Sequence, residues 1–269
     1  MKQKKASVVL SGHNAGETNP PTFDNTTFDE YAGLYEQLAQ WPYRKYLEIP
    51  ALAACLGDLT GQTVLDFGCG PGFFSRWLKQ LGAQAVVGHD ISAGMLNYAR
   101  RREEKERQGI IYLAELDETY TAAFDIVLAI YVLPYAPDHG ALRALCRSMA
   151  RALKPGGRLI TLPLHPDFHP DAEYYRAYGF RLIEPAPRRD GGKVRLHLCQ
   201  PPYDINLDAY YWSAETLAAA LADAGFINLR WPGLTLPAGP APTPQGGIEF
   251  LLPYFRRPHV AIIECVKEG

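Results

Sequence analysis

Three closely spaced glycines and a later aspartate are the residues of this sequence best placed to bind a ligand. Gly68, Gly70 and Gly72 follow the short apolar run 64–67, and an amphipathic segment comes next. A backbone without Cβ atoms turns sharply and lets a ligand lie against the amides at the start of a helix. Asp90 follows about 20 residues later, the offset at which a carboxylate takes both hydroxyls of a ribose. The spacing predicts a nucleoside-binding turn.

Two details indicate which nucleoside derivative this turn binds. Phe73 stands where the dinucleotide fingerprint G-x-G-x-x-G needs its third glycine, which argues against NAD. Asp66 lies two residues before the first glycine, where its carboxylate would repel a pyrophosphate but suit a ligand with an ammonium and a sulfonium. We therefore expect a nucleoside with a cationic tail.

The motifs D-F-G-C-G-P-G, G-H-D-I-S and L-K-P-G-G-R-L-I closely resemble those of the class I methyltransferases that use S-adenosylmethionine. The resemblance runs from about Asp24 to Lys267. Within it, the segments F-D-E-Y-A-G-L-Y-E-Q, A-I-Y-V-L-P-Y-A and Y-Y-W-S-A-E-T-L resemble the branch that includes toxoflavin-type small-molecule N-methyltransferases. The resemblance implies S-adenosyl-L-methionine as cofactor and S-adenosyl-L-homocysteine as its product.

Apolar runs and amphipathic segments alternate along the chain and outline the elements that must hold these residues. Ser92 and Ser213 are predicted helix N-caps. Three short strands predict a small antiparallel addition at 178–184, 193–199 and 205–212. Strands of the main sheet are predicted at 64–67, 86–90, 109–113, 124–130, 158–162, 227–231 and 259–266. We expect an α/β fold: a Rossmann-like, doubly wound sheet of seven mostly parallel strands, with the last strand antiparallel as the resemblance implies.

The 269 residues, 47% of them hydrophobic, suit one domain around one core. We interpret residues 1–20 as a flexible extension, because their apolar run is too short for a signal peptide or a membrane span. Residues 21–269 form the predicted methyltransferase domain, with an N-terminal helical lid at about 24–50 and a cap insertion at about 172–212. By resemblance, such an insertion covers the substrate.

Composition excludes several classes of partner. A net charge of −2 and a pI near 6.4 leave no broad basic face for nucleic acid. The five cysteines are scattered and odd in number, so neither a disulfide framework nor a zinc site is indicated, and a reduced cytoplasm fits. The segment after the fourth strand has no aspartate-rich set, which argues against magnesium. We expect a monomer or homodimer with a small-molecule partner, away from membranes.

Expected cofactor contacts lie in the lid, at the glycine turn and where the second to fourth strands end. By resemblance, Tyr31 and Arg44 would touch the methionine end of the cofactor, although the lid aromatics suit packing on the sheet equally well. An acidic residue after the third strand would meet the adenine amino group, either Glu115 or Asp117. Met95 would cover the adenine or fill the core. The full set is Tyr31, Arg44, Asp66, Gly68, Cys69, Gly70, Asp90, Ile91, Met95, Glu115, Leu116 and Ile130.

Methyl transfer from a sulfonium is an in-line displacement, which needs a nucleophile at about 3 to 3.5 Å and the exclusion of water. A base helps when the acceptor is a ring N–H or a hydroxyl. His165 follows the fifth strand and is the candidate base; the alternative is that His165 and His169 are partly exposed loop residues. Tyr131 and Tyr135 follow the fourth strand and would face the transferred methyl.

These features predict methyl transfer to a nitrogen of a small heteroaromatic metabolite. An oxygen or carbon acceptor is the nearest alternative. A cofactor-binding protein without catalysis, or a nucleotide-dependent oxidoreductase, would belong to a different class; Phe73 argues against the oxidoreductase.

Overall fold

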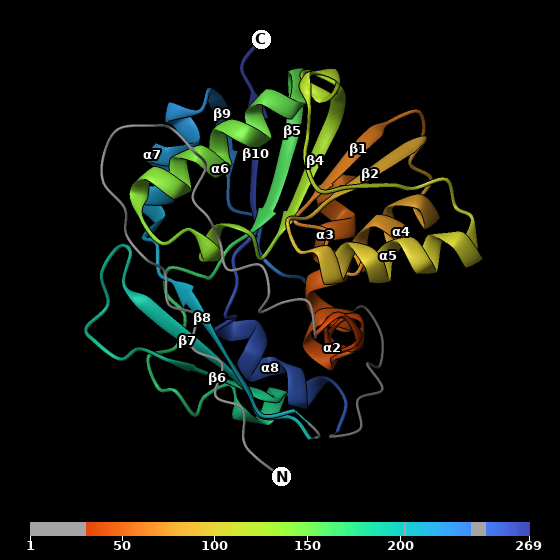
Figure 1. The fold of residues 1–269 in the computed structure, drawn as a ribbon. Helices are drawn as coiled ribbons and strands as arrows, with labels where there is room; N and C mark the ends of the chain where they lie inside the picture. Colours follow the sequence, from red (N-terminus) through yellow and green to blue (C-terminus); the bar gives the residue numbers. More distant parts are fainter. Residues whose placement is uncertain (1–30, 202, 238–245) are drawn as a thin grey trace.

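The computed structural model describes residues 31–201, 203–237 and 246–269. The predicted extension 1–20 and the first residues of the predicted lid lie outside the described residues. Figure 1 shows a large sheet flanked by helices, and a second, smaller sheet beside two further helices at the edge where the strands of the large sheet converge.

The large sheet has seven strands in the order β3-β2-β1-β4-β5-β10-β9. β10 pairs antiparallel with both of its neighbours, whereas the other pairings are parallel. The doubly wound, mostly parallel fold with an antiparallel last strand is therefore confirmed. Its strands are β1 (Thr63–Phe67), β2 (Ala85–His89), β3 (Ile111–Leu113), β4 (Phe124–Ile130), β5 (Leu153–Leu162), β9 (Phe226–Arg230) and β10 (Ile263–Lys267).

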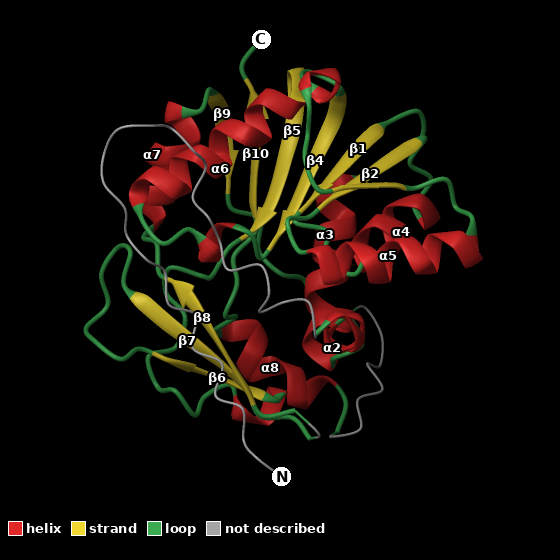
Figure 2. Cartoon of the chain, viewed as in Figure 1, coloured by secondary structure: helices red, strands yellow, loops and turns green. Residues whose placement is uncertain are grey.

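Helices cover both faces of this sheet (Figure 2). Leu65 and Phe67 of β1 point into the core beneath α6 and α7, while Val64 points into the core beneath α3, α4 and α5. This alternation is the period of two that a strand covered on both sides requires. The helices are α3 (Ile49–Leu56), α4 (Phe73–Gln80), α5 (Ala93–Glu106), α6 (His139–Ala152) and α7 (Ala214–Asp223).

Two predicted N-caps are confirmed. The Ser92 hydroxyl accepts a hydrogen bond from Met95 N at 3.2 Å and begins α5, and the Ser213 hydroxyl accepts one from Thr216 N at 3.2 Å and begins α7. Both serines have extended backbones, as N-cap residues do, so each satisfies an amide that the first helical turn leaves unpaired.

The small sheet confirms the predicted antiparallel addition. Its three strands, β6 (Phe180–Ile183), β7 (Lys193–Leu198) and β8 (Ile205–Tyr210), lie in sequence order and pair antiparallel. We call this sheet the cap. Short helical turns join the main elements: η2 (Glu118–Tyr120), η3 (Leu133–Tyr135) and η4 (Arg176–Tyr178).

A third core, separate from the two sheet faces, joins the cap to α2 (Ala32–Leu38), the π-helical turn η1 (Arg44–Glu48) and α8 (Ile248–Arg256). Tyr43 stacks on Tyr254 of α8 with ring centroids 4.6 Å apart, and it packs in a tilted arrangement on Phe180 of the cap with centroids 5.5 Å apart. The aromatic residues of the lid therefore pack on the cap and α8 rather than on the large sheet.

The sequence predicted no helix before the last strand, yet α8 occupies residues 248–256 and contains Pro253. A proline inside a helix removes a hydrogen bond, so this segment has only a weak helical signal. The last strand also begins later than predicted, at Ile263, because residues 259–262 form only a single bridge, between Leu164 and Val260.

Candidate functional site

The glycine turn follows β1 and runs directly into α4. Gly68, Gly70 and Gly72 have φ values of +76°, +53° and +83°, in the left-handed region that favours glycine. A Cβ on Gly68 would lie 2.6 Å from Cγ2 of Val132, and one on Gly72 would lie 2.4 Å from the Tyr112 hydroxyl oxygen. Backbone conformation and close packing together require glycine here.

Asp90 joins the end of β2 to this turn. Its Oδ2 accepts a hydrogen bond from Gly70 N at 2.7 Å, and its Oδ1 accepts one from Ser92 N at 2.8 Å. The amides of Gly68 and Cys69 both donate to the carbonyl oxygen of His89, at 2.7 and 2.9 Å. Hydrogen bonds within the chain therefore hold the turn against β2.

A cavity opens at the carboxyl ends of β1, β2 and β4, between α2 and strand β8 of the cap. We call it the main cavity. Ligands of open α/β sheets bind in this place, where the strand order reverses. The structure brings ten of the predicted site residues to its wall: Arg44, Gly68, Cys69, Gly70, Asp90, Ile91, Met95, Ile130, Tyr131 and Tyr135.

Asp66 does not line the main cavity, contrary to the expectation that its charge attracts the ligand there. Its side chain is 1% exposed, and its Oδ2 accepts a hydrogen bond from the Ser75 hydroxyl at 2.6 Å. Burial raises the pKa of Asp66 to about 7. Asp66 therefore ties β1 to α4.

Three further predicted residues also lie off the cavity walls. Tyr31 packs against the third core, and Leu116 packs against the core beneath α6 and α7. Glu115 is exposed, two residues beyond the end of β3. β3 ends at Leu113, and neither Glu115 nor Leu116 reaches the wall of the main cavity.

His89 is a cavity residue that the sequence reasoning missed. Its ring packs on Phe67 with centroids 4.9 Å apart, and its Nδ1 has no hydrogen-bond partner among the described residues. Burial lowers the pKa of His89 to about 4, so the ring is neutral at pH 7. The sequence feature that could have identified His89 was its position at the end of a predicted strand, directly before Asp90.

His165 lines neither this cavity nor the one described next. Its Nδ1 accepts a hydrogen bond from the amide of Asp167 at 2.9 Å, and its own amide donates to the carbonyl oxygen of His259 at 2.8 Å. These contacts shape a turn after β5. The structure thus places His165 as the alternative interpretation describes, in a partly exposed loop.

A second cavity adjoins the main one and shares Tyr35, Arg44, Tyr131, Tyr135 and Leu207 with it. We call it the cap cavity, because β6, β7 and β8 form much of its wall. Leucines dominate its remaining lining: Leu38, Leu164, Leu182, Leu196 and Leu198, together with Tyr43, Pro134, Ala209 and His259. Its wall is therefore apolar apart from a few polar side chains.

A buried polar cluster lies where the two cavities meet. Glu48 is 2% exposed and accepts hydrogen bonds from the hydroxyl groups of Tyr131, at 2.8 Å, and Tyr254. The Tyr254 hydroxyl also bonds to Nδ1 of His259 at 2.6 Å. Burial raises the pKa of Glu48, and burial with nearby Arg44 and His165 holds the pKa of His259 well below its usual value.

Arg44 is the cation of this cluster. Its Nε lies 3.8 Å from Glu48 Oε2, and its guanidinium lies 4.5 Å from the centroid of the Tyr131 ring. Nε has no hydrogen-bond partner among the described residues, although Arg44 lines both cavities. Tyr131 has a φ of +59°, unusual for a residue with a side chain, and this bend after β4 brings its ring to the junction.

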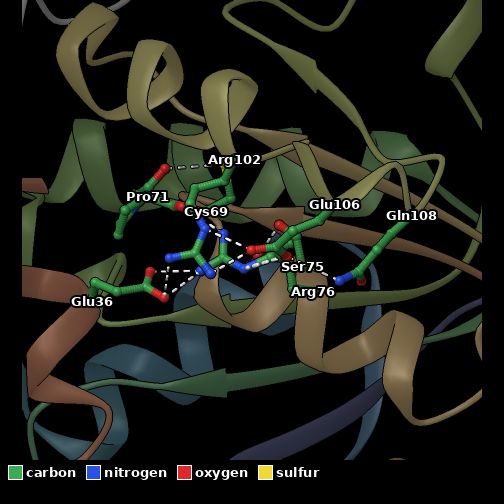
Figure 3. Close-up of polar contacts among 10 residues, drawn as sticks. Glu36, Cys69, Pro71, Ser75, Arg76, Arg102, Glu106 and Gln108 are labelled. Carbon is green, nitrogen blue, oxygen red and sulfur yellow. Dashed lines mark hydrogen bonds and ion pairs between the residues drawn. The ribbon is translucent and has the colours of Figure 1, made fainter. Parts of the chain in front are cut away.

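A second polar network fastens the lid over the glycine turn (Figure 3). Arg76 of α4 is 4% exposed; it donates to Glu36 of α2, and its Nη1 donates to the carbonyl oxygen of Pro71 at 3.0 Å. Glu106 of α5 lies 3.7 Å from Arg76 Nε and accepts from Arg102. One buried arginine thus connects α2, α4 and α5.

Two further observations on the described ranges concern metal binding and membrane spans. No group of three or more histidine, cysteine, aspartate or glutamate side chains comes together there in a way that could hold a metal ion. Within the same ranges, no helix has the length and apolarity needed to cross a membrane.

Comparisons with known proteins agree with this geometry. Residues 64–157 match a family model described as a methyltransferase domain. The chain is 28% identical to N-demethylindolmycin N-methyltransferase of Streptomyces griseus, over 77% of this chain and 88% of that protein. It is 31% identical to demethylmenaquinone methyltransferase of Tropheryma whipplei, over 69% of this chain and 76% of that protein.

Among solved structures, an S-adenosylmethionine dependent methyltransferase from Mesorhizobium loti shares the fold. The two structures superpose with a TM-score of 0.55, at 23% identity, over 86% of this chain and 100% of the other.

Proposed function

This chain belongs to the S-adenosylmethionine-dependent methyltransferases, and from that premise we propose that it methylates a ring nitrogen of a small, flat heteroaromatic metabolite. S-adenosylmethionine is its cofactor. The observation that carries the proposal is the apolar cap cavity, which opens beside the main cavity and shares three tyrosines with it: Tyr35, Tyr131 and Tyr135.

The main cavity fits the cofactor. The three glycines leave a cradle that side chains would fill, so the cofactor lies against the turn between β1 and α4. Asp90 takes the ribose hydroxyls, because its carboxylate lies on the cavity wall directly after β2 and a carboxylate can accept several hydrogen bonds. When bound, the cofactor supplies an electrophilic methyl group.

Other cavity residues hold the two ends of the cofactor in this proposal. Ile91 and Met95 pack on the adenine ring, with His89 at its edge. Arg44 faces the methionine carboxylate, because its Nε is buried without a hydrogen-bond partner among the described residues and its guanidinium borders the main cavity.

The cap cavity holds the methyl acceptor. Its leucines and tyrosines favour a flat, largely apolar molecule, which they shield from water. Two findings support nitrogen as the acceptor atom: the relative named as an N-methyltransferase, and the motifs that resemble toxoflavin-type enzymes. The partner is then a small molecule rather than nucleic acid or a membrane, and the protein works as a monomer or homodimer.

Two measurements test this proposal. Calorimetric titration with S-adenosylhomocysteine, beside NAD as control, should give binding of the first and none of the second. Turnover of methyl-¹³C S-adenosylmethionine with a panel of heteroaromatic N–H compounds, and with hydroxyl compounds of matched shape, then identifies the acceptor. The ¹³C shift of the product distinguishes N-, O- and C-methyl groups, so an O- or C-methyl product would overturn the nitrogen assignment and leave the enzyme class intact.

A further inference from the structure

We propose that His259 is the catalytic base for the methyl acceptor, and that Tyr254 and Glu48 position it in the tautomer that this role needs. The inference rests on the proposed function, because it concerns the acceptor that occupies the cap cavity. It assigns the base to a residue near the carboxyl end of the chain and gives the buried cluster a chemical role.

The hydrogen-bond chain determines which nitrogen of His259 carries the proton. Tyr254 has one hydroxyl hydrogen, and it donates this hydrogen to Glu48 Oε1. The 2.6 Å bond between Tyr254 and His259 Nδ1 then needs its hydrogen from the histidine. His259 is therefore protonated on Nδ1 and carries its lone pair on Nε2.

The surroundings of Glu48 fix the donor and acceptor in each of these hydrogen bonds. Both of its oxygens accept hydrogen bonds, one from Tyr131 and one from Tyr254, and Arg44 lies at 3.8 Å. A buried carboxylate with two hydroxyl donors and a neighbouring cation is satisfied in its ionised form. A carboxylate acts purely as an acceptor, so Tyr254 must donate to it and His259 must donate to Tyr254.

The remaining nitrogen of His259 is available to a ligand. His259 lines the cap cavity, its side chain is 5% exposed, and Nε2 has no hydrogen-bond partner among the described residues. Its ring stacks with that of Tyr131 at a centroid distance of 5.8 Å and an interplanar angle of 20°. Tyr131 borders both cavities, so His259 lies beside the place where acceptor and cofactor meet.

Nearby groups keep this histidine neutral. Burial, with the positive charge of Arg44, holds the pKa of His259 below its usual value, so at neutral pH Nε2 is free to accept a proton. The titratable groups that face the ring from the elements around it are Tyr43, Arg44, Glu48, Tyr131, His165, Tyr175 and Tyr254.

The step balances without another reactant. His259 Nε2 takes the proton of the acceptor N–H while the acceptor nitrogen bonds to the methyl carbon and the carbon–sulfur electron pair returns to sulfur. The positive charge moves from the sulfonium to the imidazolium, whose Nδ1–H remains bonded to Tyr254 beside the Glu48 carboxylate. His259 then releases the proton to water as the product leaves. The acceptor class is thus an apolar ring with a neutral N–H.

The direct test is the tautomer of His259 in the cofactor-free, full-length protein. Two-bond ¹H–¹⁵N correlation spectra separate the two neutral tautomers and the charged ring, and replacing the other six of the seven histidines one at a time assigns the signal. We expect neutral His259 with its proton on Nδ1 between about pH 6 and pH 8. A proton on Nε2, or a charged ring at neutral pH, would overturn the proposal.

Two matched variants test the positioning role. Tyr254→Phe removes the hydroxyl between Glu48 and His259, so the signal of His259 should move toward the Nε2–H form. Tyr174→Phe removes a hydroxyl that donates to the carbonyl oxygen of Pro253 in the same helix, without contact to His259. It should leave the tautomer unchanged; equal spectra from both variants would remove Tyr254 from the role.

Turnover measurements give a second test of His259, with an acceptor identified in the ¹³C panel. His259→Asn should lower kcat about 100-fold and Tyr254→Phe about tenfold, with unchanged affinity for S-adenosylhomocysteine as evidence of folding. Unchanged kcat in His259→Asn would overturn the role as base. If no acceptor is turned over, the proposed function fails while the tautomer measurement still decides the geometry.

Discussion

Arg76 Nη2 donates to both carboxylate oxygens of Glu36, at 2.6 Å each, and this pair joins the lid helix α2 to the helix that follows the glycine turn. The Arg76 side chain is 5% exposed and that of Glu36 is 21% exposed. Because the pair is largely shielded from water, it holds α2 over the cofactor side of the main cavity more firmly than a surface ion pair would.

Glu36→Gln should therefore loosen the lid. Losing the charge on one partner weakens hydrogen bonds worth about 1.4 kcal/mol or more, which corresponds to a roughly tenfold weaker affinity for S-adenosylhomocysteine. Calorimetry measures the affinity, and hydrogen exchange should show faster exchange in α2. Glu104→Gln, at an exposed position of α5, is the control. Equal affinities of the two variants would mean that α2 takes no part in holding the cofactor.

Asp90→Ala should weaken cofactor binding more strongly. It removes the proposed ribose contact together with the acceptor for Gly70 N and Ser92 N, and we expect a loss of about 1.5 to 3 kcal/mol. Asp117→Ala removes an exposed carboxylate after β3, away from the cavities, and should leave the affinity for S-adenosylhomocysteine unchanged. Calorimetric titration with S-adenosylhomocysteine measures the affinity of both variants. Unchanged affinity in Asp90→Ala would remove this residue from the ribose site.

Gly72→Ala tests the close packing of the turn. The new Cβ would meet the Tyr112 hydroxyl at 2.4 Å in a backbone with φ +83°, so both strain and a clash should lower the free energy of unfolding, by about 3 kcal/mol or more. Gly82 has a φ of +96° with open space around it. Gly82→Ala should therefore lower the free energy of unfolding by only about 1 kcal/mol, through backbone strain alone. Urea unfolding measures both; similar losses would contradict the clash.

Asp66 should make stability depend on pH. Its pKa is about 7 in the folded protein against 3.8 ordinarily, so between these values the folded state binds more protons than the unfolded state. Its favourable contribution is complete below about pH 4 and is lost as pH rises through about 7. At 1.36 kcal/mol per pKa unit, the loss is at most about 4 kcal/mol.

Asp66→Asn should remove most of this pH dependence, because the amide keeps an acceptor for Ser75 and does not ionise. Urea unfolding between about pH 4 and pH 8 measures the slope, with Asp223→Asn at a more exposed carboxylate as control. If Asp66→Asn and the unmodified protein show the same slope, Asp66 does not change its protonation state over this pH range.

The sheet and its ligand-binding edge were predictable because their signals are local. The run before Gly68 and the capping serines Ser92 and Ser213 sit beside the elements that they define, and the structure confirms those elements. The predicted adenine contact at Glu115 or Asp117, and the predicted cofactor contact at Leu116, depended on where β3 ends and which way the chain leaves it, which no short motif specifies.

The polar cluster could not be predicted from the sequence. Glu48 and Tyr254 are 206 residues apart in the chain, and no periodicity relates them. His259 looked like the start of the last strand, and α8 was hidden by Pro253. The local pattern at His165 indicated a histidine after a strand. The histidine that borders the cap cavity is His259, which is distant in sequence and lies beside His165 only in the folded chain.

The third core also has a consequence for how the chain is made. Leu34 and Leu47 near its beginning pack with residues of the cap and with Leu251 and Tyr254 near its end. Because synthesis proceeds from the amino terminus, strands β1 to β5 are available to pair while α8 is still missing. The walls of the cap cavity, which include His259, therefore close after the large sheet has begun to form, and the site for the acceptor is completed later than the strands beside the cofactor.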